Sequence, residues 1–352
     1  MDIAFNILSF HNLIFRLDMI PSKKVVAFCA IASFATLQAI AIGQDPYLRP
    51  DAAPSPKDNL PSEARTELGK KLFFDPRLSG SNWISCASCH NPGLGWSDGL
   101  PQAIGHGMGT LKRSTPTIVN VGFNNIQMWD GRFSTLEQQA LGPIQDKGEM
   151  NQDLAGLVTK LSAIDGYRQE FDEAYSGEGI SASTIAKALA AFERTILCGE
   201  SSFDRWRKGD KEAISESAKH GFALFETKAK CTTCHEGFNF TDNGFHNIGV
   251  KPTKDEDDLG RFAVKKVAIN KGAFKTPTLR DVALTAPYMH NGLYRTLEDV
   301  VEHYDRGGDV TDNLSPNMSP LNLSAQEKAD LVAFMKTLTG KSIQVAIPQL
   351  PQ

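Results

Sequence analysis

The chain has 352 residues, of which 41% are hydrophobic and 22% are charged. This is the composition of an ordinary globular protein, and it provides enough apolar material for two hydrophobic cores. The formal net charge of −4 and the absence of any Lys/Arg-rich block argue against nucleic acid as a partner.

The N-terminal residues have the pattern of an export signal. Lys23 and Lys24 precede the apolar run 25–42, which ends in a small-x-small pattern. These features are typical of a cleaved signal peptide. We therefore expect residues 1–43 to be a signal peptide, with Met19 as a candidate start of translation, and the mature protein to be periplasmic. The alternative is an uncleaved membrane anchor, because about 18 apolar residues can just span a bilayer.

The next segment leads into the first predicted helix. Residues 44–60 are rich in proline and polar residues, which predicts an extended lead-in. A helix is predicted over 63–74, because Leu68, Leu72 and Phe73 fall on one face.

Two short motifs carry the chemistry. Residues 86–90 read Cys-Ala-Ser-Cys-His and residues 231–235 read Cys-Thr-Thr-Cys-His. In haem c attachment each thiol forms a thioether to a haem vinyl group, and the adjacent imidazole ligates the iron. One copy alone could be a redox dithiol or half of a zinc site, but neither needs a histidine after the second cysteine in both copies. We therefore predict two covalently bound haem c groups. The attachment residues are Cys86, Cys89, Cys231 and Cys234, and the proximal ligands are His90 and His235.

The motifs belong to an internal duplication. A Gly-x-x-Leu-Phe pattern at 69–73 recurs at 221–225, and each copy precedes one motif. Each copy should close with an amphipathic helix, predicted over 183–197 in the first and after Ser324 in the second. In the second helix Ser324 and Glu327 form a capping box.

The expected fold is mainly α, with two cytochrome c-like domains packed together and each carrying one covalent haem c. The domains are predicted over residues 61–212 and 213–345. Short helices are predicted over 153–164 and 167–175, and the one strand signal, over 262–269, is compatible with a short hairpin.

Further segments in a fixed order support a family resemblance. They include Leu72–Ser79, Ile104–Gly107, Met128–Arg132, Gly148–Met150, Lys275–Arg280 and Thr285–Gly292. With the two motifs, they resemble the bacterial di-haem cytochrome c peroxidases and their MauG-like relatives. The resemblance covers nearly everything from about residue 60 to residue 340. It implies that the first haem is peroxidatic and that the second receives electrons from a donor.

The resemblance also implies roles at the first haem. His106 resembles the distal histidine that blocks the iron in resting enzyme and swings away on activation. Glu149 resembles the distal glutamate that moves a proton between the two peroxide oxygens. Gln139 and Pro143 match other residues of that pocket, and Trp129 matches the tryptophan between the two haems.

A calcium ion typically lies between the two domains in this family. Thr285 and Pro287 match positions that supply backbone carbonyls to it, and Ser114 replaces the usual asparagine ligand. Serine is a shorter and poorer ligand, although hard oxygen ligands remain.

The second haem shows the most informative departure. Ordinary peroxidases of the family carry a methionine 17 residues after the proline that matches Pro287, where this chain has Tyr304. MauG-like enzymes carry a tyrosine there. A thioether favours ferrous iron, whereas an anionic phenolate stabilises higher oxidation states. Met289 and Met318 are the alternative ligands.

The main functional hypothesis is an exported di-haem peroxidase that reduces hydrogen peroxide at the first haem. Its electrons would come through the second haem from a small redox protein, either a cytochrome c or a cupredoxin. The alternative is MauG-like oxidation of side chains on a partner protein, which Tyr304 favours and His106 opposes. A non-catalytic electron carrier is the third hypothesis. A homodimer is compatible with the sequence.

Overall fold

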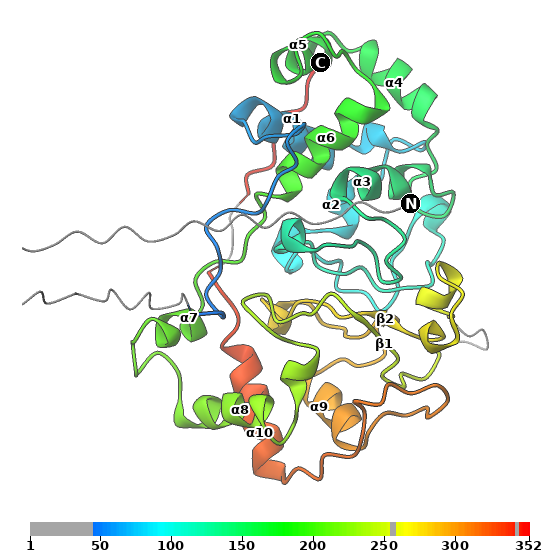
Figure 1. Cartoon of the computed structure of the whole chain (residues 1–352). Coiled ribbons are helices and arrows are strands. Elements are labelled where there is room, and N and C mark those ends of the chain that lie inside the picture. The colour runs from blue at the N-terminus through cyan, green and yellow to red at the C-terminus, as the bar shows by residue number, and fades with distance from the viewer. Residues whose placement is uncertain (1–44, 254–257, 342–344) are drawn as a thin grey trace, which may run out of the picture. The chain divides into compact units, whose positions relative to one another are not determined.

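The computed structural model describes residues 45–253, 258–341 and 345–352 (Figure 1). The predicted signal peptide, including Met19, lies outside the described residues. Among those that are described, none of the helices combines the length and the apolar character needed to cross a membrane.

The described residues are mainly helical, as predicted. In chain order the helices are α1 (Glu63–Phe74), α2 (Cys86–Cys89), α3 (Leu136–Gln145), α4 (Leu154–Ser162), α5 (Asp165–Ala174), α6 (Ala182–Glu193), α7 (Ser202–Arg207), α8 (Glu216–Glu226), α9 (Leu297–Asp305) and α10 (Ala325–Lys336). Two strands of two residues each, β1 (Phe245–His246) and β2 (Phe274–Lys275), pair antiparallel.

The first hydrophobic core is built on the crossing of α1 and α6 (Figure 1). Helix α1 begins after Ser62, whose hydroxyl accepts a hydrogen bond from the backbone N–H of Arg65. Gly69 lies at the crossing, where a Cβ atom would overlap the carbonyl oxygen of Ala188. The glycine therefore allows the two backbones to approach closely.

The second core repeats this arrangement with α8 and α10 (Figure 1). Gly221 takes the place of Gly69, and a Cβ atom there would overlap the carbonyl oxygen of Asp330. The predicted capping box at the start of α10 is formed, because Ser324 and Glu327 exchange side-chain and backbone hydrogen bonds. The two halves are thus built on the same helix crossing.

Two predicted elements differ in the structure. The helix expected over 183–197 ends at Glu193, because the backbone beyond it bonds instead to the Asn120 side chain and backbone. The strand expected within 262–269 is wrong. That stretch forms two 3₁₀ turns, Arg261–Ala263 and Ala268–Asn270, and its residues 263–269 are exposed with no neighbouring strand to pair with.

The two ends of the described chain connect the two cores. The ring of Tyr47 in the lead-in packs on Phe203 and Phe240 of the second core. Near the C-terminus, the carbonyl oxygen of Pro351 accepts a hydrogen bond from Arg77 in the first half. The domain limits remain predictions. The burial of Phe203 in the second core favours a boundary before α7 rather than at residue 212.

Candidate active site

Both motif histidines are held in the orientation that iron ligation requires. The ring nitrogen Nδ1 of His90 donates to the carbonyl oxygen of Trp96 at 3.1 Å, and Nδ1 of His235 donates to that of Phe240 at 2.8 Å. A carbonyl can only accept, so the proton of each neutral ring lies on Nδ1. The lone pair of Nε2 is left for a metal, and such a hydrogen bond also increases the basicity of the ligand.

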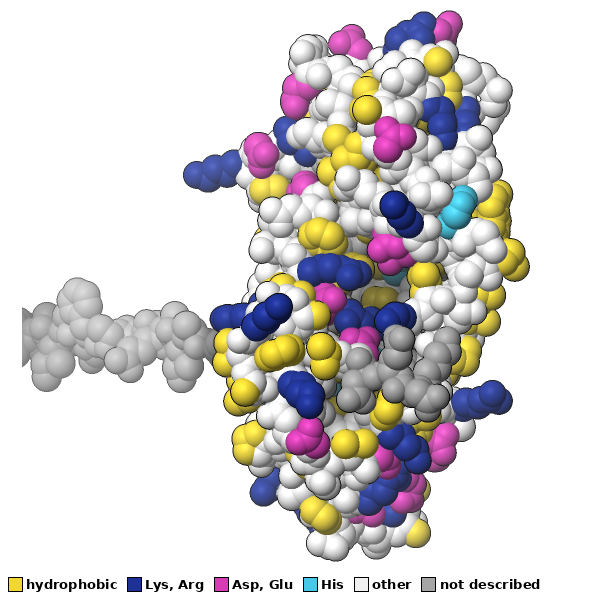
Figure 2. Space-filling view, turned by 90° about the vertical axis from the view of Figure 1, so that its right-hand side faces the viewer, with side chains coloured by type: hydrophobic (Ala, Val, Ile, Leu, Met, Phe, Trp, Pro, Cys, Tyr) yellow, Lys and Arg dark blue, Asp and Glu magenta, His cyan; other side chains and the backbone are white. Residues whose placement is uncertain are grey.

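One cavity of about 740 Å³ is lined by both motifs. Its walls include all four motif cysteines, none of which forms a disulfide, and both motif histidines. Four free thiols and two oriented imidazoles in a largely apolar cavity fit two covalently attached haem groups. Figure 2 shows one face of the molecule hollowed, with Lys and Arg side chains at the edge of the hollow.

The wall of the first site contains the predicted distal residues. Glu149, Gln139 and Pro143 all line the cavity, and the last two come from α3. Burial raises the pKa of Glu149, with a smaller rise from Asp146 and an opposing effect from Arg132. A carboxyl with a raised pKa next to a peroxide site can carry a proton from one oxygen to the other.

His106 is not part of this wall. Its Nε2 accepts a hydrogen bond from the Asn151 side-chain amide at 3.1 Å, and its ring does not line the cavity. The role of distal iron ligand therefore does not fit His106 in this conformation. The loop nevertheless positions the catalytic candidate, because the backbone N–H of His106 donates to the carbonyl oxygens of Gly148 and Glu149 at 2.8 and 2.9 Å.

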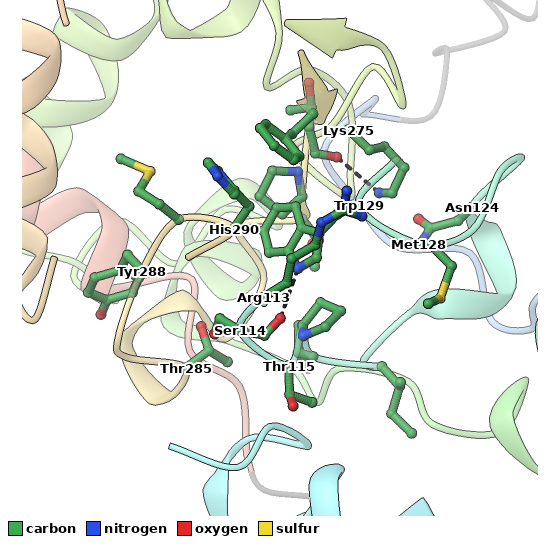
Figure 3. Close-up of a pocket in the computed structure, with 18 of the residues that line it drawn as sticks. Arg113, Ser114, Thr115, Asn124, Met128, Trp129, Lys275, Thr285, Tyr288 and His290 are labelled. Carbon is green, nitrogen blue, oxygen red and sulfur yellow. Dashed lines mark hydrogen bonds between the residues drawn. The ribbon is translucent and has the colours of Figure 1, made fainter. Parts of the chain in front are cut away.

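Trp129 lies where the two halves of the chain meet (Figure 3). Its indole N–H donates to the carbonyl oxygen of Ser114 at 2.9 Å. Its own carbonyl oxygen accepts from the backbone N–H of Lys275 in β2 at 2.8 Å. Trp129 also lines the cavity that contains both motifs. This is the arrangement expected of a residue that carries charge between two sites.

Tyr304 lies at the second site. It comes from α9, lines the cavity, and interacts electrostatically with Cys231 and Cys234. Burial raises the pKa of its hydroxyl, which forms no hydrogen bond to any described residue. The alternative ligands Met289 and Met318 line the same cavity. Of the three candidates, Tyr304 is close to the second motif, and the two methionines line the cavity that contains both motifs.

The residues expected around calcium can also be located in the structure. Ser114, Thr285 and Pro287 all line the cavity (Figure 3 shows the first two). The carbonyl of Ser114 already accepts from Trp129, and its hydroxyl makes only a long contact of 3.5 Å with the carbonyl of Leu100. A serine hydroxyl and two backbone carbonyls are hard ligands, but few for this ion, so calcium remains a prediction.

Several cavity residues have no counterpart among the sequence predictions. They are Arg113, Glu193, His246, Lys275 and His290. His246, Asp242 and Cys234 are close enough to hold a metal ion, but a thioether on Cys234 would remove the thiolate from that set. Lys275 and His290 lie in segments that carry the family resemblance, whereas Arg113 and Glu193 are brought to the cavity by contacts between distant segments, which no local sequence pattern reveals.

The fold and the site define a c-type di-haem oxidoreductase that acts on hydrogen peroxide. The family model for di-haem cytochrome c peroxidases matches residues 63–212, and the model for cytochrome c matches residues 218–339. The chain belongs to the di-haem cytochrome c peroxidase family.

Similar proteins include both branches of this family. Methylamine utilization protein MauG of Methylorubrum extorquens is 45% identical over 93% of this chain and 94% of its own. Cytochrome c551 peroxidase of Pseudomonas aeruginosa is 37% identical over 82% of this chain and 83% of its own. The crystal structure of a MauG-like protein associated with microbial copper homeostasis superimposes with a TM-score of 0.78 at 32% identity, covering 86% of this chain and 96% of the other.

Proposed function

We propose that the protein uses hydrogen peroxide to oxidise a side chain, a tryptophan first among the candidates, on a partner protein. The observation that carries this proposal is Tyr304, whose hydroxyl faces the second site and has no hydrogen-bond partner among the described residues. The higher identity to MauG than to the cytochrome c551 peroxidase supports the same assignment.

The electrostatics of Tyr304 suit a tyrosine that binds a metal. Burial disfavours the phenolate, so the hydroxyl keeps its proton unless a cation lies opposite. A bound ferric ion would supply that cation, so Tyr304 could hold it through the ionised hydroxyl. The resulting anionic ligand favours high oxidation states over the ferrous state, which suits the storage of oxidising equivalents better than acceptance of electrons from a cytochrome.

The reaction balances with a protein substrate. Hydrogen peroxide, two electrons and two protons give two waters, and the partner side chain loses two electrons and two protons. The haems, when bound, supply the iron that takes peroxide and the redox steps. Glu149 carries the proton from the inner to the outer peroxide oxygen. Trp129 conveys charge between the two halves.

The second candidate is an ordinary peroxidase that takes electrons from a small redox protein. The presence of Met289 and Met318 in the cavity favours it, because either could ligate the second iron in place of Tyr304. A pure electron carrier is less well supported, since a partly buried carboxyl such as Glu149 in the cavity serves peroxide chemistry and not electron transfer.

The test offers the holoprotein two kinds of reductant with peroxide. One is reduced cytochrome c, and the other is a periplasmic extract whose proteins are then searched by mass spectrometry for oxidised tryptophan. We expect oxidation of one protein that depends on peroxide and is lost in Glu149→Gln, together with slow oxidation of cytochrome c. Rapid turnover of cytochrome c without any modified protein would overturn the proposal in favour of the second candidate.

Location and calcium complete the proposal. The N-terminal pattern supports a periplasmic protein, in agreement with haem c attachment outside the cytoplasm. A calcium ion bound by Ser114, Thr285 and Pro287 would join the two halves near Trp129. Removal of calcium by a chelator should change the tryptophan fluorescence. An unchanged fluorescence would argue against that site.

A further inference from the structure

Helices α6 and α10 are equivalent in the two halves, and one buried position in them differs in chemistry. The helix crossing that occurs in both halves places Ala188 of α6 against Gly69 and Asp330 of α10 against Gly221. Five residues later along each helix the first half has Glu193 and the second half has Met335. Both are buried, with exposed fractions of 6% and 7%. A carboxyl therefore stands in the first half where the second half has an apolar thioether.

One carboxylate oxygen of Glu193 lacks a hydrogen-bond donor among the described residues. It lines the cavity on the side of the first motif, and its Oε2 is buried without a hydrogen bond from any described residue. A buried carboxyl usually has such a partner, because leaving it unpaired is unfavourable. The fold therefore leaves Oε2 of Glu193 without a hydrogen-bond donor at the cavity wall.

The charged groups around Glu193 have opposing effects on its ionisation. Arg194, next in the chain, and Glu137 from α3 act on it with opposite signs, and they pair with each other at 2.7 Å. Cys86 of α2 also interacts with it, but this thiol becomes an uncharged thioether when haem is attached. Helix α1 contributes apolar side chains such as Leu72 and Phe73.

Burial is therefore the main influence on the ionisation of Glu193. It raises the pKa of Glu193 to about 8, with Arg194 lowering this pKa and Glu137 raising it. A raised pKa means that the neutral acid dominates below about pH 8 and the carboxylate above it. A positive charge appearing in the cavity would favour the carboxylate, and its removal would favour the acid.

We propose that Glu193 is the proton-exchanging group of the first haem site, releasing its proton when that haem is oxidised and regaining it on reduction. Loss of one electron by the haem would be matched by loss of one proton from the Glu193 carboxyl to bulk water, so the net charge of the buried site would be unchanged. On reduction both return. In this proposal Glu193 acts on the haem through its charge and does not contact peroxide. The inference needs the haem at the first motif but not the proposed protein substrate.

The experiment is a spectroscopic redox titration of the holoprotein between about pH 6 and about pH 10, without peroxide. One proton bound per electron changes the reduction equilibrium of the first haem about tenfold per pH unit, with reduction weaker at higher pH. We expect this dependence around pH 8 in the wild-type protein and its loss in Glu193→Gln. Glu193→Met, which copies the second half, should behave in the same way.

Two control measurements test whether the pH dependence of the first haem arises from Glu193. The second haem should keep its own pH profile in both Glu193 variants, because the equivalent position there is Met335. Glu149→Gln should retain the dependence near pH 8, although it removes the other cavity carboxyl with a raised pKa. A dependence that survives in Glu193→Gln but disappears in Glu149→Gln would overturn the proposal.

A measurement on the wild-type protein tests the proposal even if the variants fail to fold. Reduction of the wild-type holoprotein in unbuffered solution at about pH 8 should take up about one proton per first haem reduced. No proton uptake at that pH would also overturn the proposal. Neither result depends on whether cytochrome c or a protein side chain is the natural reductant, so the outcome is separate from that of the proposed function.

Discussion

Trp129 and His290 occupy equivalent positions on opposite sides of the junction between the two halves. The carbonyl of Trp129 accepts from the backbone N–H of Lys275, and the carbonyl of His290 accepts from that of Ser114, both at 2.8 Å. Each residue follows a methionine with a left-handed φ of 73°. The junction is therefore close to two-fold symmetric in its backbone. Only the first half places an indole there, and that side chain donates to Ser114.

This relationship predicts the effect of Trp129→Phe. Phenylalanine keeps an aromatic ring and the backbone hydrogen bond to Lys275, but it removes the readily oxidised indole and the bond to Ser114. We expect both haems to be retained and peroxide to react at the first haem at an unchanged rate. Oxidation of the second haem should slow by at least about tenfold, as followed by stopped-flow absorption. His290→Phe is the matched control at the equivalent position. Equal rates in wild type and Trp129→Phe would show that charge passes elsewhere.

The helix crossings give a prediction about stability. Alanine at Gly69 or Gly221 would push a Cβ atom into the carbonyl of Ala188 or Asp330. Overpacking of this kind typically costs about 1–3 kcal/mol. Each variant should lower the midpoint of denaturant unfolding of the holoprotein. Gly93→Ala is the control, because there a Cβ atom would meet only the Asn91 side chain at 3.3 Å. Unchanged midpoints would mean that the helices can separate at no cost.

The local features of the fold could be predicted from the sequence. The caps at Ser62 and Ser324 depend on hydrogen bonds within a few residues, so the sequence alone identifies them. The end of α6 could not be predicted in this way, because the chain leaves the helix to bond with Asn120, over 70 residues earlier. The apolar residues of 262–269 suggested a strand, but pairing depends on a neighbouring strand that this segment lacks.

The same distinction holds at the site. The two Cys-x-x-Cys-His motifs are contiguous, and the structure brings both to one cavity. The ring of His106 is turned from the cavity by Asn151, a contact that depends on how two loops pack. Glu193 reads in the sequence as one polar residue at the end of an apolar helix. Its burial becomes evident only when α1 and α3 are packed against α6.

Attachment of the haems can be tested one at a time. The double change Cys86→Ala with Cys89→Ala removes both thiols of the first motif and leaves the second intact. We expect the pyridine haemochrome signal of the denatured protein to fall from two haems to one, because thioether bonds survive denaturation whereas ligation does not. The same change at Cys231 and Cys234 should give the same stoichiometry with the other haem lost. Two haems remaining in either variant would contradict the assignment.

Glu149→Gln tests proton transfer at the first haem. Glutamine keeps the shape of the side chain but cannot carry a proton, so peroxide cleavage should slow about 10²- to 10⁴-fold. The resting spectra of both haems should be unchanged. Since burial raises the pKa of Glu149, the ionised base forms only at higher pH than for an exposed glutamate, and the wild-type rate should fall as pH decreases through that raised pKa. Glu173→Gln, on the exposed face of α5, is the control. If stopped-flow mixing of Glu149→Gln with peroxide gave an unchanged rate of peroxide cleavage, Glu149 would not be the proton-transfer group.

The last prediction concerns Tyr304, which decides between the two enzyme classes. Phenolate ligation predicts no upfield methionine methyl resonance in the NMR spectrum of the reduced protein, and a second haem that ascorbate reduces poorly. Tyr304→Met replaces the anionic oxygen with a thioether, so it should make the second haem easy to reduce and increase the rate of cytochrome c oxidation by peroxide. Tyr304→Phe is the matched control, because it removes the hydroxyl and offers no ligand. It should therefore lose the phenolate spectrum without gaining the methionine signal.

The wild-type spectrum can contradict this assignment directly. A methionine methyl signal would place Met289 or Met318 on the second iron, since both line the same cavity. In that case Met318→Leu or Met289→Leu should abolish the signal, and Tyr304→Phe should leave ascorbate reduction unchanged. The hydroxyl of Tyr304 would then lie at the cavity wall without a ligand or a hydrogen bond to any described residue, and removing it should not destabilise the protein. A destabilised Tyr304→Phe holoprotein with unchanged spectra would not agree with either assignment.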